Sequence, residues 1–246
     1  MTEYFENPSL YFRGRYVVDL RKTLARDLLG ELKETRILDL GCGDGTVSLQ
    51  FLGNGNQLTL ADSSRAMLSL VRASVPKHLE NTVTLVESAL EDLPDQQFDI
   101  VICLGVLAHV QSVERAVQKI AASMRPGARC LIQITDHDRR IASLVRLFAG
   151  VRHLLQQCGR YEVNVTTRAQ LEQCAGNLGL ECLESKAYSL GIPGAGRLLS
   201  QRVLYKYAEL SLRSTMMQPL CSEVLLLFKK QVGHAVLATA GRGNDY

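Results

Sequence analysis

The chain has 246 residues, of which 46% are hydrophobic and 22% charged, a composition that favours one large globular domain and excludes disorder, collagen and coiled coil. The longest apolar run, residues 100–108, is too short for a membrane-spanning helix. The net charge of +3 is too small to indicate a nucleic-acid partner by itself.

The first half of the chain alternates predicted helices and strands. Apolar residues recur three or four apart over residues 17–34, which predicts an N-terminal helix. Short apolar runs then predict five strands, at residues 37–40, 58–61, 83–86, 98–104 and 129–135. Amphipathic stretches between them predict helices at residues 45–52, 64–74 and 112–124, the last ended by Pro126 and Gly127. This alternation predicts an α/β fold, with a doubly wound, mostly parallel sheet and helices on both faces.

The alternation breaks at residue 139. Residues 139–157 predict a basic amphipathic helix, and further helices are expected at 167–178 and 198–212. Strands at 181–190 and 222–230 complete a predicted seven-stranded sheet. We therefore expect one domain over residues 1–233, with helical insertions at 139–160 and 191–220 after strands five and six, and a disordered tail at 234–246.

The N-terminus and the cysteines indicate a cytoplasmic protein. The first residues, MTEYFENPSLYFRGR, lack the basic start and apolar stretch of a secretory signal. The seven cysteines are scattered and contain no Cys-x-x-Cys pair, which favours reduced thiols over disulfides or a metal site.

Positive charge is concentrated late in the chain. Residues 139–214 carry 11 Lys and Arg against 5 Asp and Glu, a net +6, whereas residues 1–138 carry 14 against 18, a net −4. A basic segment suits an anionic ligand, an acidic carrier or an anionic membrane surface, and a solvated basic face is an equally open alternative.

The sequence ILDLGCGDG at residues 37–45 places a buried strand directly before a glycine-rich turn. Glycines there permit positive φ and let a ligand approach the backbone closely. Asp62 ends the next predicted strand, where a carboxylate can accept both hydroxyls of a ribose. Dinucleotide sites use G-x-G-x-x-G to bring a pyrophosphate to a helix N-terminus. Here Asp44 stands inside G-x-G-x-G, which disfavours an anion at this turn.

Residues 37–134 resemble the class I S-adenosylmethionine-dependent methyltransferases, especially the small-molecule branch of the ubiquinone-biosynthesis type. The likeness rests on LDLGCGDG (38–45), ESALEDLP (87–94), CLGVLAHV (103–110) and MRPGARCLI (124–132). It implies a Rossmann-like fold with S-adenosylmethionine as cofactor, S-adenosylhomocysteine as product, and no metal.

The resemblance also implies roles for particular residues at the cofactor. Asp39 and the backbone of Gly41, Cys42 and Gly43 would hold the methionine portion, and Asp62 would bind the ribose. Ser63 and Met67 would flank the adenine, while Leu104 and Gly105 would line the sulfonium. Ala89 stands where the family usually has an acid, so the backbone at Leu90 or the side chain of Glu91 is expected to bind adenine N6.

Few catalytic side chains are expected, because methyl transfer from a sulfonium depends mainly on placement. His109, just after the fourth strand, is the candidate general base, with packing against the next helix as the alternative. Asp136 and His137 end the fifth strand and are candidates to orient an acceptor hydroxyl or amine, or are a solvated pair.

Substrate contacts are expected from both ends of the chain. Residues 1–34 are expected to fold over the site as a helical lid that carries Tyr11 and Tyr16, with a packed helix as the alternative. The two insertions should form a cap over the acceptor, in which Arg146 and Arg152 would meet an anionic or carrier-bound acceptor.

The sequence therefore predicts methyl transfer to an O, N or C atom of a small molecule. A non-catalytic member that binds the cofactor or a partner, and a tRNA or protein methyltransferase, remain alternatives. No nucleic-acid partner is expected, because no added nucleic-acid module is present. Peripheral membrane contact through the basic insertion stays open, as does the choice between monomer and homodimer.

Overall fold

The computed structural model describes residues 15–90, 96–136, 164, 166–189, 200–213, 221 and 223–233. The helices are α3 (Arg15–Leu29), α4 (Arg65–Ser74), α5 (Val113–Ala122), α7 (Arg168–Asn177) and α9 (Gln201–Arg213), with 3₁₀ turns η2 (Leu49–Phe51) and η3 (Lys77–Thr82). The strands are β1 (Arg36–Leu40), β2 (Gln57–Asp62), β3 (Val83–Glu87), β4 (Phe98–Cys103), β5 (Met124–Thr135), β6 (Leu180–Tyr188) and β7 (Glu223–Lys230).

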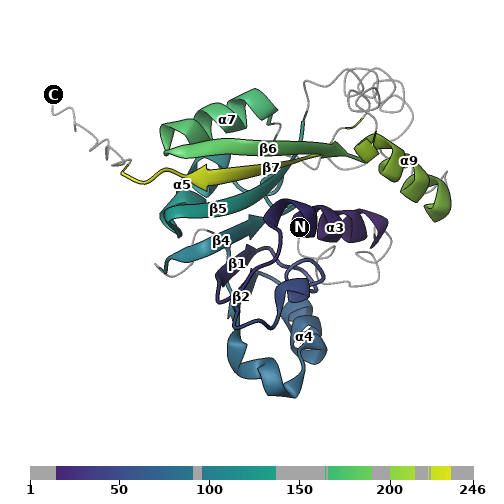
Figure 1. Ribbon diagram of the computed structural model, residues 1–246, viewed down its shortest axis with the longest axis vertical. Coiled ribbons are helices and arrows are strands. Elements are labelled where there is room, and N and C mark those ends of the chain that lie inside the picture. The colour runs from purple at the N-terminus through teal and green to yellow at the C-terminus, as the bar shows by residue number, and fades with distance from the viewer. Residues whose placement is uncertain are drawn as a thin grey trace.

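The seven strands form one sheet in the order β3-β2-β1-β4-β5-β7-β6 (Figure 1). The pairs from β3 to β5 are parallel, and β7 is antiparallel to both β5 and β6. The predicted doubly wound, mostly parallel seven-stranded sheet is therefore confirmed. Because β7 runs the other way, its first residue, Glu223, pairs with the last residue of β5, Thr135.

Helices cover both faces of the sheet and bury one apolar cluster on each. Helices α3 and α4 pack on one face around Ile37 and Ile100, and α5 and α7 pack on the other around Leu38 and Val101. Neighbouring strand residues divide between the clusters because successive side chains of a strand point to opposite faces. Burying each of these Leu or Ile side chains contributes about 1.5–3 kcal/mol to the free energy of folding. A shift of the strands would expose such side chains, so the two clusters hold the strand ends in register.

Local capping explains where several helices begin. The side chain of Ser64 accepts from the amide of Met67 at the start of α4, and that of Ser112 accepts from the amide of Arg115 at α5. Thr167 forms a capping box with α7. The helices expected at 64–74, 112–124 and 167–178 are confirmed to within two residues at either end.

Three expectations about element boundaries were wrong. The N-terminal helix ends at Leu29, because Gly30 takes a φ of +69° that stops it before residue 34. Residues 45–52 form turns and only the short η2, since Gly45 has a φ of +74° that an α-helix does not allow. The stretch MRPGA does not separate helix from strand but belongs to β5, where a register shift against β4 accommodates it.

The proposed insertions and lid lie mostly outside the described residues. Residues 1–14, 139–160 and 234–246 are not described, and of the insertion 191–220 the structure describes 200–213. There α9 confirms the helix expected at 198–212, to within three residues at its start and one at its end. The division into domain, lid, caps and tail therefore stays a prediction. In the described part of the chain, no helix is both long and apolar enough to span a membrane.

Candidate functional site

A glycine-rich turn follows β1 at the edge of the sheet where the parallel strands end. Gly41 and Gly43 have φ of +66° and +55°, in the left-handed region that favours glycine. The amide of Gly41 donates to the carbonyl of Ala61 in β2 (2.8 Å). A Cβ at residue 41 would lie 2.4 Å from Cγ2 of Val106. The turn is therefore packed between β2 and the loop after β4, where only bare backbone fits.

Asp62, the last residue of β2, faces this turn. Its Oδ2 accepts a hydrogen bond from the amide of Gly43 (2.8 Å), and its Oδ1 accepts one from the amide of Ser64 (2.8 Å). A carboxylate offers about four lone-pair sites, so the two bonds fix the group and leave capacity for two ligand hydroxyls. Ser63 beside it is exposed, and Met67 on α4 is buried.

Asp39 lies inside the protein behind the turn. Its side chain is 3% exposed, and burial raises the pKa of Asp39 to about 7, with a smaller contribution in the same direction from Asp62. The Ser48 hydroxyl lies near enough to lower that pKa in part, although it makes no hydrogen bond of regular geometry. Burial and these acids raise the pKa of the Cys42 thiol, which is therefore neutral. A cation beside Asp39 would stabilise its charged form.

The other residues expected at the cofactor lie along the same edge. The amide of Ser88 donates to the carbonyl of Asp62 (3.2 Å), which brings the end of β3 beside β2. Ala89, which follows it, is exposed, and Leu90 is buried. Leu104, after β4, is half-buried against the cluster under α3. Glu91 lies outside the described residues.

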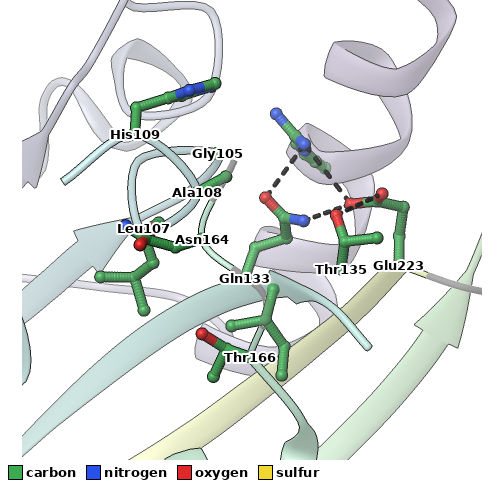
Figure 2. A pocket seen from close by; sticks show the side chains of 11 residues that line it. Gly105, Leu107, Ala108, His109, Gln133, Thr135, Asn164, Thr166 and Glu223 are labelled. Carbon is green, nitrogen blue, oxygen red and sulfur yellow. Dashed lines mark hydrogen bonds and ion pairs between the residues drawn. The ribbon is translucent and has the colours of Figure 1, made fainter. Parts of the chain in front are cut away.

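A cavity of about 250 Å³ opens next to this edge, at the ends of β4 and β5 and the start of β7 (Figure 2). Gly105 lines it with a φ of +78°, and a Cβ there would lie 2.9 Å from Nη1 of Arg21. Arg21 comes from α3, so the helix that precedes the glycine-rich turn also contributes to the cavity. The cavity thus adjoins the residue expected to line the sulfonium.

Five polar side chains from four elements form a network at the cavity. Nε of Arg21 donates to the Tyr188 hydroxyl (3.0 Å), and its Nη2 donates to Oε1 of Gln133 (3.0 Å) and lies 3.7 Å from Oε2 of Glu223. The Gln133 amide donates to Glu223 Oε2, and the Thr135 hydroxyl donates to its Oε1 (3.0 Å). Figure 2 shows Gln133, Thr135 and Glu223 pointing toward one another.

The charge of Glu223 is balanced within this network. Burial raises the pKa of Glu223, and the Arg21 guanidinium and the Thr135 hydroxyl both act against that rise. Breaking a buried, hydrogen-bonded charge pair by removing one partner is costly. The network therefore holds Arg21 and Glu223 in defined positions.

His109 lies at the cavity on the loop after β4, half-buried, and burial lowers its pKa. The imidazole is therefore neutral near pH 7, the form that can accept a proton. Asn164 holds this loop: its amide donates to the Ala108 carbonyl (3.0 Å), and its side chain donates to the carbonyls of Leu107 (3.3 Å) and Val110. The general-base role of His109 therefore stays a prediction.

Asp136 is buried and is not among the residues that line the cavity. Its Oδ1 accepts from the amide of Arg168 at the start of α7 (3.3 Å), and it forms a β-bridge with Thr166. This placement gives Asp136 a helix-capping contact, so an orienting role toward the acceptor is unsupported by its position.

Several expected substrate residues cannot be placed. Tyr11, His137, Arg146 and Arg152 lie outside the described residues, and Tyr16 is described only as part of the backbone of α3. Among the described residues, no group of three or more His, Cys, Asp or Glu side chains is arranged to hold a metal ion.

Sequence reasoning missed Arg21, Gln133 and Glu223. A signal existed for two of them, because Gln133 interrupts the apolar run RCLIQIT and Glu223 precedes the apolar run VLLLF. A polar residue inside a buried strand needs a partner, and neither partner is evident from a linear chain.

Comparison with known proteins agrees with the fold. A family model described as a methyltransferase domain matches residues 10–185. The ubiquinone biosynthesis O-methyltransferase of Alkalilimnicola ehrlichii is 31% identical over 140 residues, 56% of this chain and 56% of that protein. The chain thus spans about half the length of the curated relatives it matches.

Two solved structures show the same architecture. Magnesium protoporphyrin IX methyltransferase from Synechocystis PCC 6803, with bound S-adenosylhomocysteine, matches with a TM-score of 0.66 and 15% identity over 93% of this chain and 97% of that chain. The [4+2]-cyclase SpnF matches with a TM-score of 0.58 and 17% identity over 86% of this chain and 80% of that chain. The fold therefore does not name the reaction.

The family model covers well over half of the chain, and the strand order and the glycine-rich turn facing Asp62 agree with it. The predicted resemblance is confirmed: the chain belongs to the methyltransferase-domain family, class I enzymes of Rossmann-like fold whose cofactor is S-adenosylmethionine.

Proposed function

We propose that the protein transfers a methyl group from S-adenosylmethionine to an O, N or C atom of a small-molecule acceptor. The observation that carries the proposal is the hydrogen bond from Gly43 to Asp62. It fixes an open carboxylate beside a turn whose Gly41 leaves no room for a side chain.

The donor-side residues fit the charges of S-adenosylmethionine. Asp62 has lone pairs for the ribose diol, and the buried Asp39 would gain its charged form beside the ammonium or sulfonium cation. Among the described residues, Arg21, whose guanidinium lies against Gly105, is a cation on this side that can meet the methionine carboxylate. Ser63, Met67, Leu90 and the backbone of residues 41–43 complete the proposed contacts.

The acceptor-side residues supply placement and a site for the proton. When bound, the cofactor supplies an electrophilic methyl group on a sulfonium, whose sulfur leaves as a neutral sulfide with the bonding electrons. An acceptor lone pair forms the new bond to the methyl carbon. The proton lost by an acceptor hydroxyl or amine passes to the neutral imidazole of His109. The cavity between Gly105 and His109 is the proposed place for the reacting atom.

Isothermal titration calorimetry with S-adenosylhomocysteine and S-adenosylmethionine tests the donor side. Asp62→Ala should lose about 1.5–3 kcal/mol of binding free energy, because a charged acceptor is removed. Asp27→Ala, at an exposed position of α3, is the matched control and should bind normally. Unchanged affinity in Asp62→Ala would remove the proposed ribose contact, and absence of binding by the unaltered protein would refute the function.

Turnover is tested by a screen of acceptors with a labelled methyl donor. Label should move to at least one small molecule that carries a nucleophilic O, N or C atom. Tight cofactor binding without transfer to any class of acceptor would favour a non-catalytic binding protein.

A further inference from the structure

A second cavity lies beside the one described above, between the start of α5 and the side of α7. Its volume is about 460 Å³, within the roughly 300–1,000 Å³ of ligand pockets. Asn164 and Thr166 line both cavities (Figure 2), so the two spaces meet at these residues. A molecule whose reacting end lies between Gly105 and His109 in the first cavity can therefore extend past this junction into the second.

The residues at the junction have hydrogen-bonding atoms to spare. Asn164 is half-buried, and its side-chain amide donates to the carbonyls of Leu107 (3.3 Å) and Val110. These bonds fix the carboxamide, while its oxygen accepts no hydrogen bond from the described part of the chain. Thr166 is only 8% exposed, and its hydroxyl has no partner among the described residues either. Because polar atoms this deep are normally hydrogen-bonded, the junction suits a ligand that supplies partners.

Carboxamides dominate the rest of the second cavity. Five of the ten described residues that line it are Asn or Gln, namely Gln111, Asn164, Gln170, Gln173 and Asn177. The Gln170 oxygen accepts in the capping box of α7. The side chains of Gln111, Gln173 and Asn177 make no hydrogen bond to any described residue. Among these ten lining residues there is no Lys or Arg, and Glu114 is the one acid. The second cavity therefore offers many neutral donors and acceptors and little charge.

A cluster of carboxamides matches hydroxyl groups better than it matches charged groups. Each carboxamide has an oxygen that accepts and an NH₂ that donates. Neighbouring hydroxyls on one ring also accept and donate, so they can use both ends. An ammonium group only donates, and a carboxylate or phosphate only accepts, so either would leave half of each carboxamide unused. Val113 and Cys174 line the same cavity and offer apolar contact to the carbon skeleton of such a ring.

We propose that the second cavity binds an uncharged, hydroxyl-rich part of the methyl acceptor, a glycosyl unit, while the atom to be methylated lies in the first cavity. This inference rests on the proposed function and adds to it the part of the acceptor that the reaction leaves unchanged. Asn164 and Thr166 would then contact the acceptor where its two parts join.

Methyl glycosides of glucose, galactose, mannose and rhamnose test the second cavity. Methoxycyclohexane, which has a six-membered ring without hydroxyls, is the matched probe. Each is titrated into the full chain saturated with S-adenosylhomocysteine, and NMR follows the side-chain NH₂ signals of Asn and Gln. At least one glycoside should shift the signals of Gln111, Gln173 and Asn177. Methoxycyclohexane should bind at least about tenfold more weakly, the loss expected for two or more hydrogen bonds.

Variants assign the binding to this cavity. The double variant Gln173→Leu, Asn177→Leu changes two exposed positions of α7 and should weaken the best-bound glycoside by about tenfold or more. Gln118→Leu, exposed on α5 but outside the lining, is the matched control and should bind it as the unaltered protein does. Melting temperatures confirm that each variant is folded, and all should bind S-adenosylhomocysteine normally.

The phenyl glycoside of the best-bound sugar tests whether the two cavities form one site. Its sugar protons should show nuclear Overhauser effects to Gln173. Its phenyl protons should show them to Leu107 or Ala108, which line only the first cavity. Thr166→Val removes the junction hydroxyl and should weaken this probe by about two- to tenfold.

The outcomes separate this inference from the proposed function. If the protein binds S-adenosylhomocysteine but no methyl glycoside, or binds methoxycyclohexane equally well, the inference is wrong while the function stands. Unchanged glycoside affinity in Gln173→Leu, Asn177→Leu would also overturn it, as would a phenyl ring that does not contact the first cavity. Failure of the unaltered protein to bind S-adenosylhomocysteine would instead overturn the proposed function, whether or not a glycoside binds.

Discussion

Replacing Gly41 by Ala probes the packing of the glycine-rich turn. The φ of +66° costs an L-residue about 1–2 kcal/mol. The new Cβ would also lie 2.4 Å from Cγ2 of Val106, and such overpacking typically costs about 1–3 kcal/mol. The two effects together predict a loss of about 2–5 kcal/mol, a large share of the roughly 5–15 kcal/mol that stabilises a typical protein.

A second glycine separates the two contributions. Gly30 has nearly the same φ, +69°, but nothing lies within 4 Å of a Cβ built there. Gly30→Ala should therefore cost only the backbone part, about 1–2 kcal/mol. In the double variant Gly41→Ala, Val106→Ala the clashing methyl is gone, so the cost of the Gly41 change should fall to the same value.

Urea unfolding without cofactor measures these differences in Gly41→Ala, Gly30→Ala, Val106→Ala, the double variant and the unaltered protein. A double-mutant cycle isolates the coupling between residues 41 and 106. If Gly41→Ala costs no more than Gly30→Ala, or if Val106→Ala recovers nothing, the turn is not packed as described. S-adenosylhomocysteine affinity should fall in Gly41→Ala and not in Gly30→Ala, because only the former turn faces Asp62.

Three further predictions concern ionisable groups. Burial raises the pKa of Asp39 from 3.8 to about 7, so the folded protein binds the proton more tightly than the unfolded chain, and stability should fall as pH rises from about 4 to 7. Asp39→Asn should therefore raise the melting temperature more at pH 8 than at pH 5, and equal shifts at both would contradict this. His109→Ala should lower kcat by about 10²- to 10⁴-fold. In the unaltered enzyme, the acid limb of the profile of kcat against pH should lie below pH 6.5, because burial lowers the pKa of His109. A kcat of His109→Ala within about threefold of the unaltered enzyme would leave His109 a packing residue. The double variant Arg146→Gln, Arg152→Gln should raise the KM for the acceptor and leave cofactor affinity unchanged. Added salt should also raise this KM, because exposed charges are screened within about 10 Å at 0.1 M. Salt-sensitive flotation of the protein on anionic vesicles would instead favour membrane docking.

Much of the fold follows from local patterns in the sequence. Alternating apolar runs and amphipathic stretches predict the parallel half of the sheet, because period-2 and period-3.6 burial are properties of short segments. Ser64, Ser112 and Thr167 mark helix starts because a cap acts within three residues. The glycine-rich turn and Asp62 are likewise recognisable, since each acts at the end of its own strand.

The acceptor side was decided only by the tertiary structure. Arg21, Gln133 and Glu223 are separated by more than eighty residues in sequence, and they meet because β7 enters antiparallel between β5 and β6. Local patterns could not show that Glu223 would face Thr135, because strand order and direction depend on how long connections pack. For the same reason Asp136, placed by its strand at the correct edge, is buried at the start of α7 instead of in the cavity.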